Sequence, residues 1–368
     1  MSDLVLFDTI NGQHGDIAQI TLNNPKSLNA LNIEMIDAIQ NALDICENDN
    51  NIKAIFLQGT GDKAFCAGGD VVGLYHSMKE TANDAIPEKA SQFFTKEYKL
   101  DFRLHNYPKP IISWGNGIVM GGGIGLAAAC SHRIVTENSM YAMPEVTIGL
   151  YPDVGASWFF NRMPNNIGMF LGLTGSRLNA SDTLFTKLAD YFVLNEFKDE
   201  LLDDLTKVQW TNDATLDVDD VIQSHHAFSH DQSPLSQVRE NYDEIQNLLA
   251  PASLKSMVKN MIETEPKTKW MGFAQKGFLK GCPMTYALVD EQIKRAKHMS
   301  LKQVFEMELI MSTRCAMNGD LQEGIRALLI DKDGNPGWQH KSVDKIASEH
   351  IEEYFKAPWN GHHPLQDM

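Results

Sequence analysis

The 22 residues from Pro110 to Ser131, PIISWGNGIVMGGGIGLAAACS, contain six glycines and no charged side chain. An uncharged run of this length is long enough for a transmembrane helix. However, its glycines disfavour one continuous helix, and Ser113, Asn116 and Ser131 are polar. The stretch instead predicts a buried strand, a glycine turn and a buried helix of small residues. The rest of the chain must supply a core around this unit.

Strand and helix signals alternate on the N-terminal side of this stretch. Residues 16–24 alternate as a strand does, 33–49 carry apolar residues at helical spacing, and 52–59 form a buried-strand pattern. This alternation predicts an α/β architecture with parallel strands. Helical periodicity dominates from about Leu178 onward, so we expect a core domain over 1–210 and a helical C-terminal region over 211–368.

Composition excludes several classes of protein. The net charge of -16 and the pI near 5.1 argue against a broad nucleic-acid-binding surface. Five cysteines without a CxxC pair predict reduced thiols, with neither a disulfide framework nor a metal site. The N-terminus has acids where a signal peptide needs basic residues, so we expect a cytoplasmic protein that is not a membrane protein.

Two glycine clusters, AFCAGGD at 64–70 and GNGIVMGGGIG at 115–125, follow predicted strands. Two backbone N–H groups that converge on one point form an oxyanion hole, and the start of a helix adds partial positive charge. Tight turns and close helix packing explain the same glycines equally well. The second cluster also resembles a dinucleotide fingerprint, but Met120 occupies the position of the third glycine.

The segment MPEVTIGLYPDVGAS, 143–157, carries two isolated acids, Glu145 and Asp153. Regular structure would separate them by roughly 26 Å in a strand or roughly 12 Å in a helix. Its glycines and Pro152 predict a bent segment instead, which could bring both acids to one pocket as an acid and base pair. In the alternative interpretation, Asp153 caps the following helix and Glu145 is an ordinary turn carboxylate.

A third acid, Glu97, lies within a helical pattern. Phe93, Glu97, Leu100 and Leu104 follow the spacing i, i+4, i+7 and i+11, which places Glu97 on the apolar face. Burial of a carboxylate is costly unless a partner or ligand satisfies it, so Glu97 is a candidate ligand-binding residue. A glutamate at the helix edge that reaches solvent is the alternative.

Four blocks, in order and spacing, resemble the crotonase (enoyl-CoA hydratase/isomerase) superfamily: LNNPKSLNAL, KAFCAGGDV, GNGIVMGGGIGLA and MPEVTIGLYPDVGAS. The last block is most similar to the branch that hydrolyses 3-hydroxyisobutyryl-CoA, as are the downstream APASLK and EGIRALLIDKDGNPGW. The resemblance implies a spiral of ββα units that binds acyl-CoA thioesters, followed by a helical C-terminal region.

The resemblance also implies roles for individual residues. Gly69 and Gly122 would donate the two oxyanion N–H groups, Glu145 and Asp153 would be catalytic, and Glu97 would contact the polar end of the acyl group. The remaining substrate-binding positions would be Lys26, Ala64, Ala67, Gly68 and Asp70, with Lys63 or Lys332 as further candidates for the phosphates. Hydratases of the superfamily use two glutamates, and the first would fall at Gly125, which has no side chain.

We therefore expect an acyl-CoA thioester hydrolase that acts on 3-hydroxyisobutyryl-CoA in valine breakdown. Coenzyme A is part of this substrate, and we expect no separate cofactor or metal. Whether Glu145 acts as nucleophile or as general base stays open, as does a homo-oligomeric state. The alternatives are a hydratase or isomerase that uses Glu145 alone, a non-catalytic acyl-CoA-binding protein and, most distantly, a dinucleotide-dependent oxidoreductase.

Overall fold

The computed structural model describes residues 2–82, 85–251 and 253–368. Contacts divide the chain into two compact units, each built from three segments. Unit 1 comprises Met1–Gly69, Leu100–Tyr141 and Leu178–Arg239, and unit 2 comprises Asp70–Lys99, Ala142–Arg177 and Glu240–Met368. This division differs from the expected boundary at 210/211, because residues 142–177 belong to unit 2 and residues 211–239 to unit 1.

A six-stranded sheet in the order β1-β2-β3-β5-β7-β9 organises unit 1. Strand β1 pairs antiparallel with β2, and every later pair is parallel, as the strand and helix alternation predicts. The strands are β1 (Val5–Ile10), β2 (Asp16–Leu22), β3 (Ile52–Gly59), β5 (Ile111–Gly115), β7 (His132–Val135) and β9 (Tyr191–Phe192).

A second sheet has the order β4-β6-β8, with β4 (Ala64–Cys66), β6 (Ile118–Met120) and β8 (Met140–Ala142). Strands β4 and β6 are parallel, and each lies within one of the two glycine clusters, just before its run of glycines at 68–69 or 121–123. Parallel strands end at the same edge of a sheet, so this pairing places the two glycine clusters next to each other. The uncharged stretch thus contains two short strands before its helix, where the sequence pattern predicted one.

The helices of unit 1 have the expected sequence signals. Helix α1 covers Ile33–Asn48, and the Asn32 side chain caps it by accepting a hydrogen bond from the Met35 N–H at 2.9 Å. The remaining helical elements are α4 (Gly122–Ala129), α7 (Ala180–Phe185), α8 (Lys198–Thr206), α9 (Ala214–Ser229), η1 (Pro25–Ser27), η3 (Asn195–Phe197) and η4 (His230–Gln232). Helix α10 (Gln237–Glu240) crosses into unit 2.

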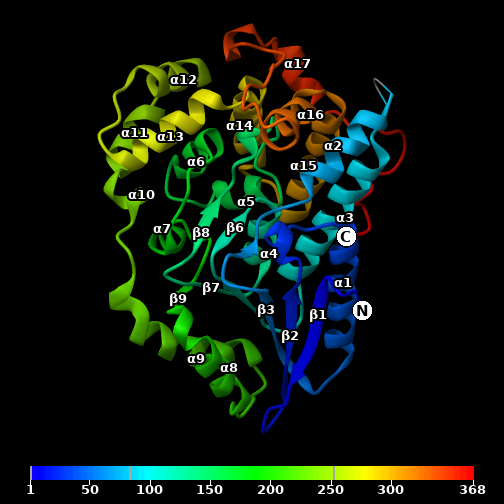
Figure 1. Cartoon of the computed structure of the whole chain (residues 1–368), viewed down its shortest axis with the longest axis vertical. Coiled ribbons are helices and arrows are strands. Elements are labelled where there is room, and N and C mark those ends of the chain that lie inside the picture. The colour runs from blue at the N-terminus through cyan, green and yellow to red at the C-terminus, as the bar shows by residue number, and fades with distance from the viewer. Residues whose placement is uncertain (1, 83–84, 252) are drawn as a thin grey trace. The chain divides into compact units, whose positions relative to one another are not determined.

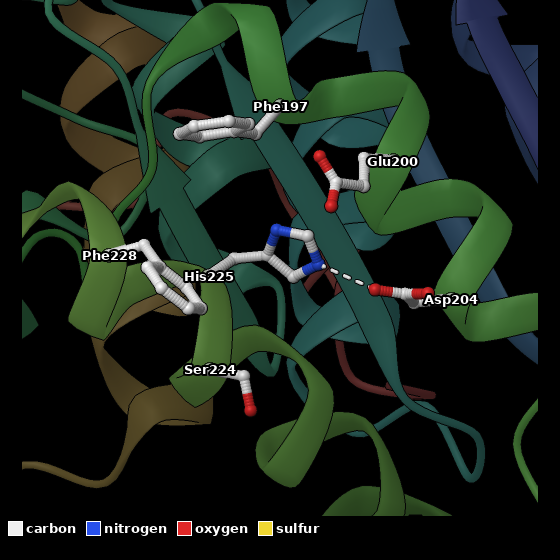
Figure 2. A pocket seen from close by; sticks show the side chains of 6 residues that line it. All are labelled: Phe197, Glu200, Asp204, Ser224, His225 and Phe228. Carbon is white, nitrogen blue, oxygen red and sulfur yellow. Dashed lines mark hydrogen bonds and ion pairs between the residues drawn. The ribbon is translucent and has the colours of Figure 1, made fainter.

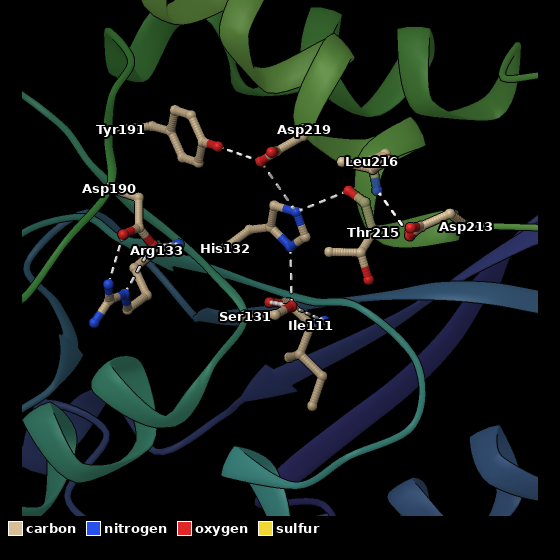
Figure 3. Close-up of polar contacts among 10 residues, drawn as sticks. All are labelled: Ile111, Ser131, His132, Arg133, Asp190, Tyr191, Asp213, Thr215, Leu216 and Asp219. Carbon is tan, nitrogen blue, oxygen red and sulfur yellow. Dashed lines mark hydrogen bonds and ion pairs between the residues drawn. The ribbon is translucent and has the colours of Figure 1, made fainter.

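Helices α8 and α9 lie side by side next to the large sheet (Figure 1), and apolar residues of both helices share one core with β2, β3, β5 and β7. A polar anchor supplements this core. Figure 3 shows His132 of β7 beneath α9, where its Nε2 lies 3.2 Å from the Thr215 carbonyl oxygen and 3.4 Å from the Asp219 carboxylate. Burial lowers the pKa of His132, so this anchor uses a neutral imidazole at pH 7.

Unit 2 is predominantly helical. Its helical elements are α2 (Val71–Glu80), the residues of α3 (Glu88–His105) up to Lys99, η2 (Glu145–Thr147), α5 (Ala156–Phe160), α6 (Ile167–Thr174), α11 (Tyr242–Leu249), α12 (Leu254–Glu263), α13 (Lys269–Lys280), α14 (Pro283–Ala296), α15 (Leu301–Met317), α16 (Asp320–Ile325), the π-helix η5 (Arg326–Ile330), η6 (Val343–Lys345) and α17 (Ser348–Glu353). No helix in the described part of the chain is long and apolar enough to cross a membrane.

Candidate active site

The segment that carries Glu145 and Asp153 is bent, as its glycines and proline predict. It begins with the 3-10 turn η2, after which the N–H groups of Ile148 and Leu150 both donate to the Glu145 carbonyl oxygen, at 3.0 and 3.1 Å. Gly149 turns with φ +75° and packs so closely on α16 that a Cβ would lie 2.5 Å from the Asp320 carbonyl oxygen. Only glycine fits this turn between the two acids.

Two C-terminal helices hold the bent segment in place. From α14, Thr285 donates to the Leu150 carbonyl oxygen at 2.7 Å, and Gln292 donates to the Pro152 carbonyl oxygen at 3.0 Å. From α15, the Glu308 carboxylate accepts from the N–H groups of Gly155 and Ser157, at 2.7 and 2.9 Å. The backbone is therefore fixed on both sides of Asp153.

The residue after Asp153 is strained. Val154 has φ +51°, which lies in the left-handed region that β-branched residues rarely adopt. Such a conformation costs about 1–3 kcal/mol and persists only where the surroundings enforce it, often at functional sites. Here the enforcement comes from burial of Val154 and from the bond between Glu308 and the next residue, Gly155.

Both carboxyl groups of the segment are buried, Glu145 with 6% and Asp153 with 4% of its surface exposed. Burial and then the Asp153 charge raise the pKa of Glu145 well above its usual value, and burial raises the pKa of Asp153 to about 6. The bend thus places Glu145 within electrostatic reach of Asp153. Two such groups hold a single proton between them over a range of pH.

The immediate partners of the two carboxyl groups differ. The Tyr98 hydroxyl donates to Asp153 Oδ2 at 2.6 Å. In contrast, Glu145 Oε2 is buried and has no hydrogen-bond partner among the described residues. The Asp153 side chain does not cap α5, because the N-cap of that helix is Gly155 and the capping carboxylate is that of Glu308. The helix-cap interpretation of Asp153 therefore fails.

Glu97 lies on the buried face of α3, where the helical spacing predicted it. Only 2% of its surface is exposed, and Phe93, Leu100 and Leu104 are buried along the same stripe. The alternative of a glutamate that reaches solvent is therefore wrong. Its neighbour Tyr98 is the residue that bonds Asp153, so consecutive positions of α3 carry two polar groups into the interior of unit 2.

The two proposed oxyanion donors lie in unit 1, on the adjoining glycine loops. Gly68, with φ +108°, approaches the other loop so closely that a Cβ would lie 3.2 Å from the Met120 carbonyl oxygen and 3.8 Å from the Gly122 nitrogen. Gly122 is the first residue of α4, where the helix dipole is positive. Within the described ranges, the N–H groups of Gly69 and Gly122 have no hydrogen-bond acceptor and are available to a ligand.

A cavity of about 360 Å³ in unit 1 lies between two segments that contain expected substrate-binding positions, one around Lys26 and one around Ala64. Its lining residues are Pro25, Leu28, Asn29, Thr60, Gly61, Asp62, Lys63 and Ala64. Asn29 is a residue that sequence reasoning missed. Its side-chain amide donates to the Ala64 and Thr60 carbonyl oxygens at 2.9 and 3.2 Å and so ties the two segments together. Leu28 and Asn29 both have left-handed backbones, with φ of 54° and 57°.

The other expected substrate-binding residues fall in several places. Lys26 lies in η1, next to the residues that line this cavity, and the Ala67 N–H donates to the Leu28 carbonyl oxygen at 3.0 Å. Asp70 caps α2 by accepting from the Gly73 N–H at 3.1 Å, which gives it a structural role. Lys332 belongs to unit 2 and does not line the cavity.

A second cavity in unit 1, of about 270 Å³, contains a histidine and an aspartate (Figure 2). His225 Nε2 lies 3.1 Å from Asp204 Oδ2. Figure 2 shows that Ser224 points away from this pair, and its hydroxyl donates to the Asp220 carbonyl oxygen at 3.1 Å. The cavity therefore contains no serine, histidine and aspartate triad. The described residues also contain no group of three or more histidines, cysteines or acids placed to hold a metal ion.

Comparison with known proteins agrees with this geometry. A family model described as enoyl-CoA hydratase/isomerase matches residues 17–355. The chain belongs to the enoyl-CoA hydratase/isomerase family. Two solved structures of similar fold are a carnitinyl-CoA dehydratase from Mycobacterium thermoresistibile (TM-score 0.86, 29% identity, 100% of both chains) and an enoyl-CoA hydratase from Rhodobacter sphaeroides (TM-score 0.81, 29% identity, 96% of this chain and 97% of that one). The expected crotonase-type fold is confirmed.

Relatives within the enoyl-CoA hydratase/isomerase family carry a more specific name. A protein of Xenopus tropicalis named 3-hydroxyisobutyryl-CoA hydrolase, mitochondrial, is 35% identical over 93% of this chain and 86% of its own length. Proteins of the same name from Danio rerio and Dictyostelium discoideum are each 34% identical over 96% of this chain, and over 89% and 91% of their own lengths.

These names correct one expectation. The relatives are named mitochondrial, which contradicts the predicted cytoplasmic location. The prediction relied on the charges of the first residues, and these charges alone do not determine the compartment in which a folded protein works.

Proposed function

We propose that this chain hydrolyses 3-hydroxyisobutyryl-CoA to 3-hydroxyisobutyrate and CoA, a reaction of valine breakdown. The buried pair of Glu145 and Asp153, held at a bend by α14 and α15, is the observation that carries the proposal. Relatives that bear the hydrolase name are about one third identical to this chain over most of its length.

Hydrolysis adds one water across the bond between acyl carbon and sulfur, so that the carbon gains the hydroxyl and the sulfur gains a proton. Glu145 either attacks the acyl carbon itself or removes a proton from the attacking water. Asp153 exchanges protons with the reacting groups, since two close carboxyls separate into one acid and one base. The N–H groups of Gly69 and Gly122 stabilise the negative charge on the thioester oxygen.

The other site residues position the substrate. Glu97 meets the hydroxyl of the acyl group, and its burial on α3 supports a role that needs a polar ligand. The adenine end of CoA occupies the cavity beside η1, where Lys26 and Lys63 supply positive charge near the phosphates. Coenzyme A enters and leaves as part of the substrate, and the reaction as proposed uses no other cofactor.

Hydration or dehydration of an acyl-CoA is the second candidate, because the two solved relatives named above carry such names. Their identity of 29% is lower than that of the hydrolase relatives, and Gly125 supplies no acid where the resemblance places the first hydratase glutamate. One series of assays distinguishes hydrolysis from hydration. It compares the rate of free-thiol release from hydroxyacyl-CoA esters with the rate at which crotonyl-CoA loses its absorbance. Faster hydration of crotonyl-CoA than thiol release from every ester would refute the proposal. Binding of the esters without turnover of any would favour an acyl-CoA-binding protein.

A homo-oligomer stays a prediction from the superfamily resemblance. Light scattering coupled to gel filtration would measure the mass against the 41.2 kDa of one chain.

A further inference from the structure

A chain of buried hydroxyl groups begins at Asp153 and runs through unit 2. The Tyr98 hydroxyl lies 2.6 Å from Asp153 Oδ2 and 2.6 Å from Ser312 Oγ. Ser312 Oγ lies 2.8 Å from the Tyr151 hydroxyl, which in turn lies 2.6 Å from the Glu308 carbonyl oxygen. Tyr98, Tyr151, Ser312 and Glu308 have no exposed surface. The chain is therefore shielded from bulk solvent.

The protons of this chain can be counted. Four oxygen–oxygen contacts join Asp153 to the Glu308 carbonyl, and each needs one hydrogen. Tyr98, Ser312 and Tyr151 each supply one, which makes three. When Asp153 is ionised, one of the four contacts is left with two oxygens and no hydrogen. When Asp153 is protonated, its own hydrogen is the fourth, and every group donates to the next along the chain.

An oxygen contact without a hydrogen is costly in a buried site, because the lone pairs repel and no solvent replaces the bond. Ser312 creates this shortage, since it adds two contacts to the chain and only one hydrogen. Tyr98 acts in the opposite sense, because its hydroxyl stabilises the ionised form of Asp153 when it donates to the carboxylate.

We propose that Ser312 raises the affinity of Asp153 for a proton, because the buried chain has a hydrogen for every contact only when Asp153 is protonated. Ser312 is a positioning residue, because it acts on Asp153 through Tyr98 and does not touch the substrate. The inference rests on the proposed function only in the roles that it gives to Glu145 and Asp153. The count of hydrogens is independent of those roles.

The other groups that face Asp153 support this assignment. Burial and then the Asp153 charge raise the pKa of Glu145, so the pair keeps at least one proton over a range of pH. The Glu308 carboxylate is occupied by the N–H groups of Gly155 and Ser157. Burial raises the pKa values of Tyr98, Tyr151 and Cys315, so these groups are neutral. No lysine, arginine or histidine of the described residues bonds Asp153, so a proton is its available counter-charge.

The test is the titration of Asp153 itself. It is monitored by ¹³C NMR of protein labelled at the aspartate carboxyl carbon, and the Asp153 signal is assigned by its loss in Asp153→Asn. Ser312→Ala leaves two contacts and two hydrogens, so the ionised form becomes fully bonded. We expect this variant to lower the midpoint of the Asp153 titration by about one pH unit. Tyr98→Phe removes the donor to the carboxylate and should raise the midpoint. The same opposite shifts are expected in the pH profile of kcat/KM.

Matched variants distinguish a shift of the Asp153 midpoint that Ser312 causes from a general disturbance of the structure. Tyr151→Phe also leaves two contacts and two hydrogens, so it should lower the midpoint as Ser312→Ala does. Ser312→Thr keeps the hydroxyl and should restore the wild-type midpoint. Ser113→Ala removes an equally buried serine hydroxyl in unit 1 and should leave the midpoint unchanged. Dispersed NMR spectra establish that each variant is folded.

An unchanged or raised midpoint in folded Ser312→Ala would overturn the inference, because a chain that merely supports the bond from Tyr98 predicts that direction. The NMR titration needs no substrate. Failure of the proposed function would appear separately, as full thiol release by Glu145→Gln while the Asp153 titration still shifts as expected.

Discussion

Asp153 follows a proline and precedes a short helix, a pattern that is typical of a helix cap, yet its carboxylate binds a tyrosine of another helix. Glu308, which lies 153 residues beyond Gly155 and 151 beyond Ser157, takes the capping position instead. This exchange leaves Asp153 free for chemistry, because its burial without a basic partner keeps its proton affinity high. The contacts of Asp153 thus support its proposed role in the reaction over a role as a helix cap.

At this scale we predict that Glu145 and Asp153 behave as one unit. Glu145→Gln should abolish most turnover while CoA-ester binding persists, and Asp153→Asn should slow turnover and move the pH optimum, because each carboxyl sets the proton affinity of the other. The double variant should cost little more than Glu145→Gln alone, since substitutions within one unit are not additive. Thiol-release kinetics over pH 5–9 measure all three variants. Additive losses would mean that the two acids act separately.

Glu97 carries a second prediction. Glu97→Gln should weaken the discrimination between the hydroxylated ester and its deoxy analogue more than it slows either reaction, because Glu97 is proposed to bond the acyl hydroxyl. The ratio of kcat/KM values for the two esters measures this effect. Lys99→Gln, on the same helix, serves as an exposed control. An equal loss on both esters would assign Glu97 a structural role.

Among the elements, α3 and α15 show which structural features a sequence pattern can predict. The apolar spacing of α3 predicted the burial of Glu97, and the same reasoning applied to α15 would have found Glu308 between Phe305 and Leu309. The partners of these residues were not predictable, because Tyr98, Tyr151 and Ser312 are separated by up to 214 residues and meet only through tertiary packing. Local spacing predicts which face of a helix is buried, but not what lies against it.

Helix α4 allows a direct test of the oxyanion role. Gly122 occupies its first position, where proline is well tolerated because the N–H there has no helical partner. Gly122→Pro should therefore preserve the fold and lower turnover by roughly 10²- to 10³-fold through loss of the donor. Gly122→Ala keeps the N–H and is the control. Thermal melting and CoA-ester binding must accompany the kinetics, and normal turnover in a folded proline variant would exclude Gly122 as a donor.

At the scale of the whole molecule, the α/β class and the helical C-terminal region follow from the sequence, whereas the composition of the two units does not. The sequence suggested one boundary near residue 210, but contacts interleave three segments in each unit. A shift in composition along the chain marks where helices begin to dominate. It carries no information about which distant helix packs against residues 142–177.

Burial of the acids also lowers the stability of the folded protein. Burial in the folded chain raises the pKa of Asp153 from its ordinary 3.8 to about 6, so the folded state binds this proton more tightly than the unfolded state. Stability from this group is therefore full below about pH 4 and declines as the pH rises through 6, by up to about 3 kcal/mol. Asp153→Asn should raise Tm at pH 8, with a gain that shrinks toward pH 4. Calorimetry at both pH values measures it, and a lower Tm at pH 8 would show that the ionised carboxylate stabilises the fold.

The hydrogen bonds from α14 and α15 to the bent segment have a consequence for the protein during its synthesis. Thr285, Gln292 and Glu308 are synthesised 135 to 153 residues after the backbone groups that they hold. At a translation rate of about 5–20 residues per second, the ribosome needs roughly 7 to 30 seconds to add them. During this interval the large sheet of unit 1 can already assemble, but the nascent turn with its two acids has no clamp. A ribosome that stalls before residue 285 therefore carries a chain with its glycine loops complete and none of the side chains that hold its acid pair.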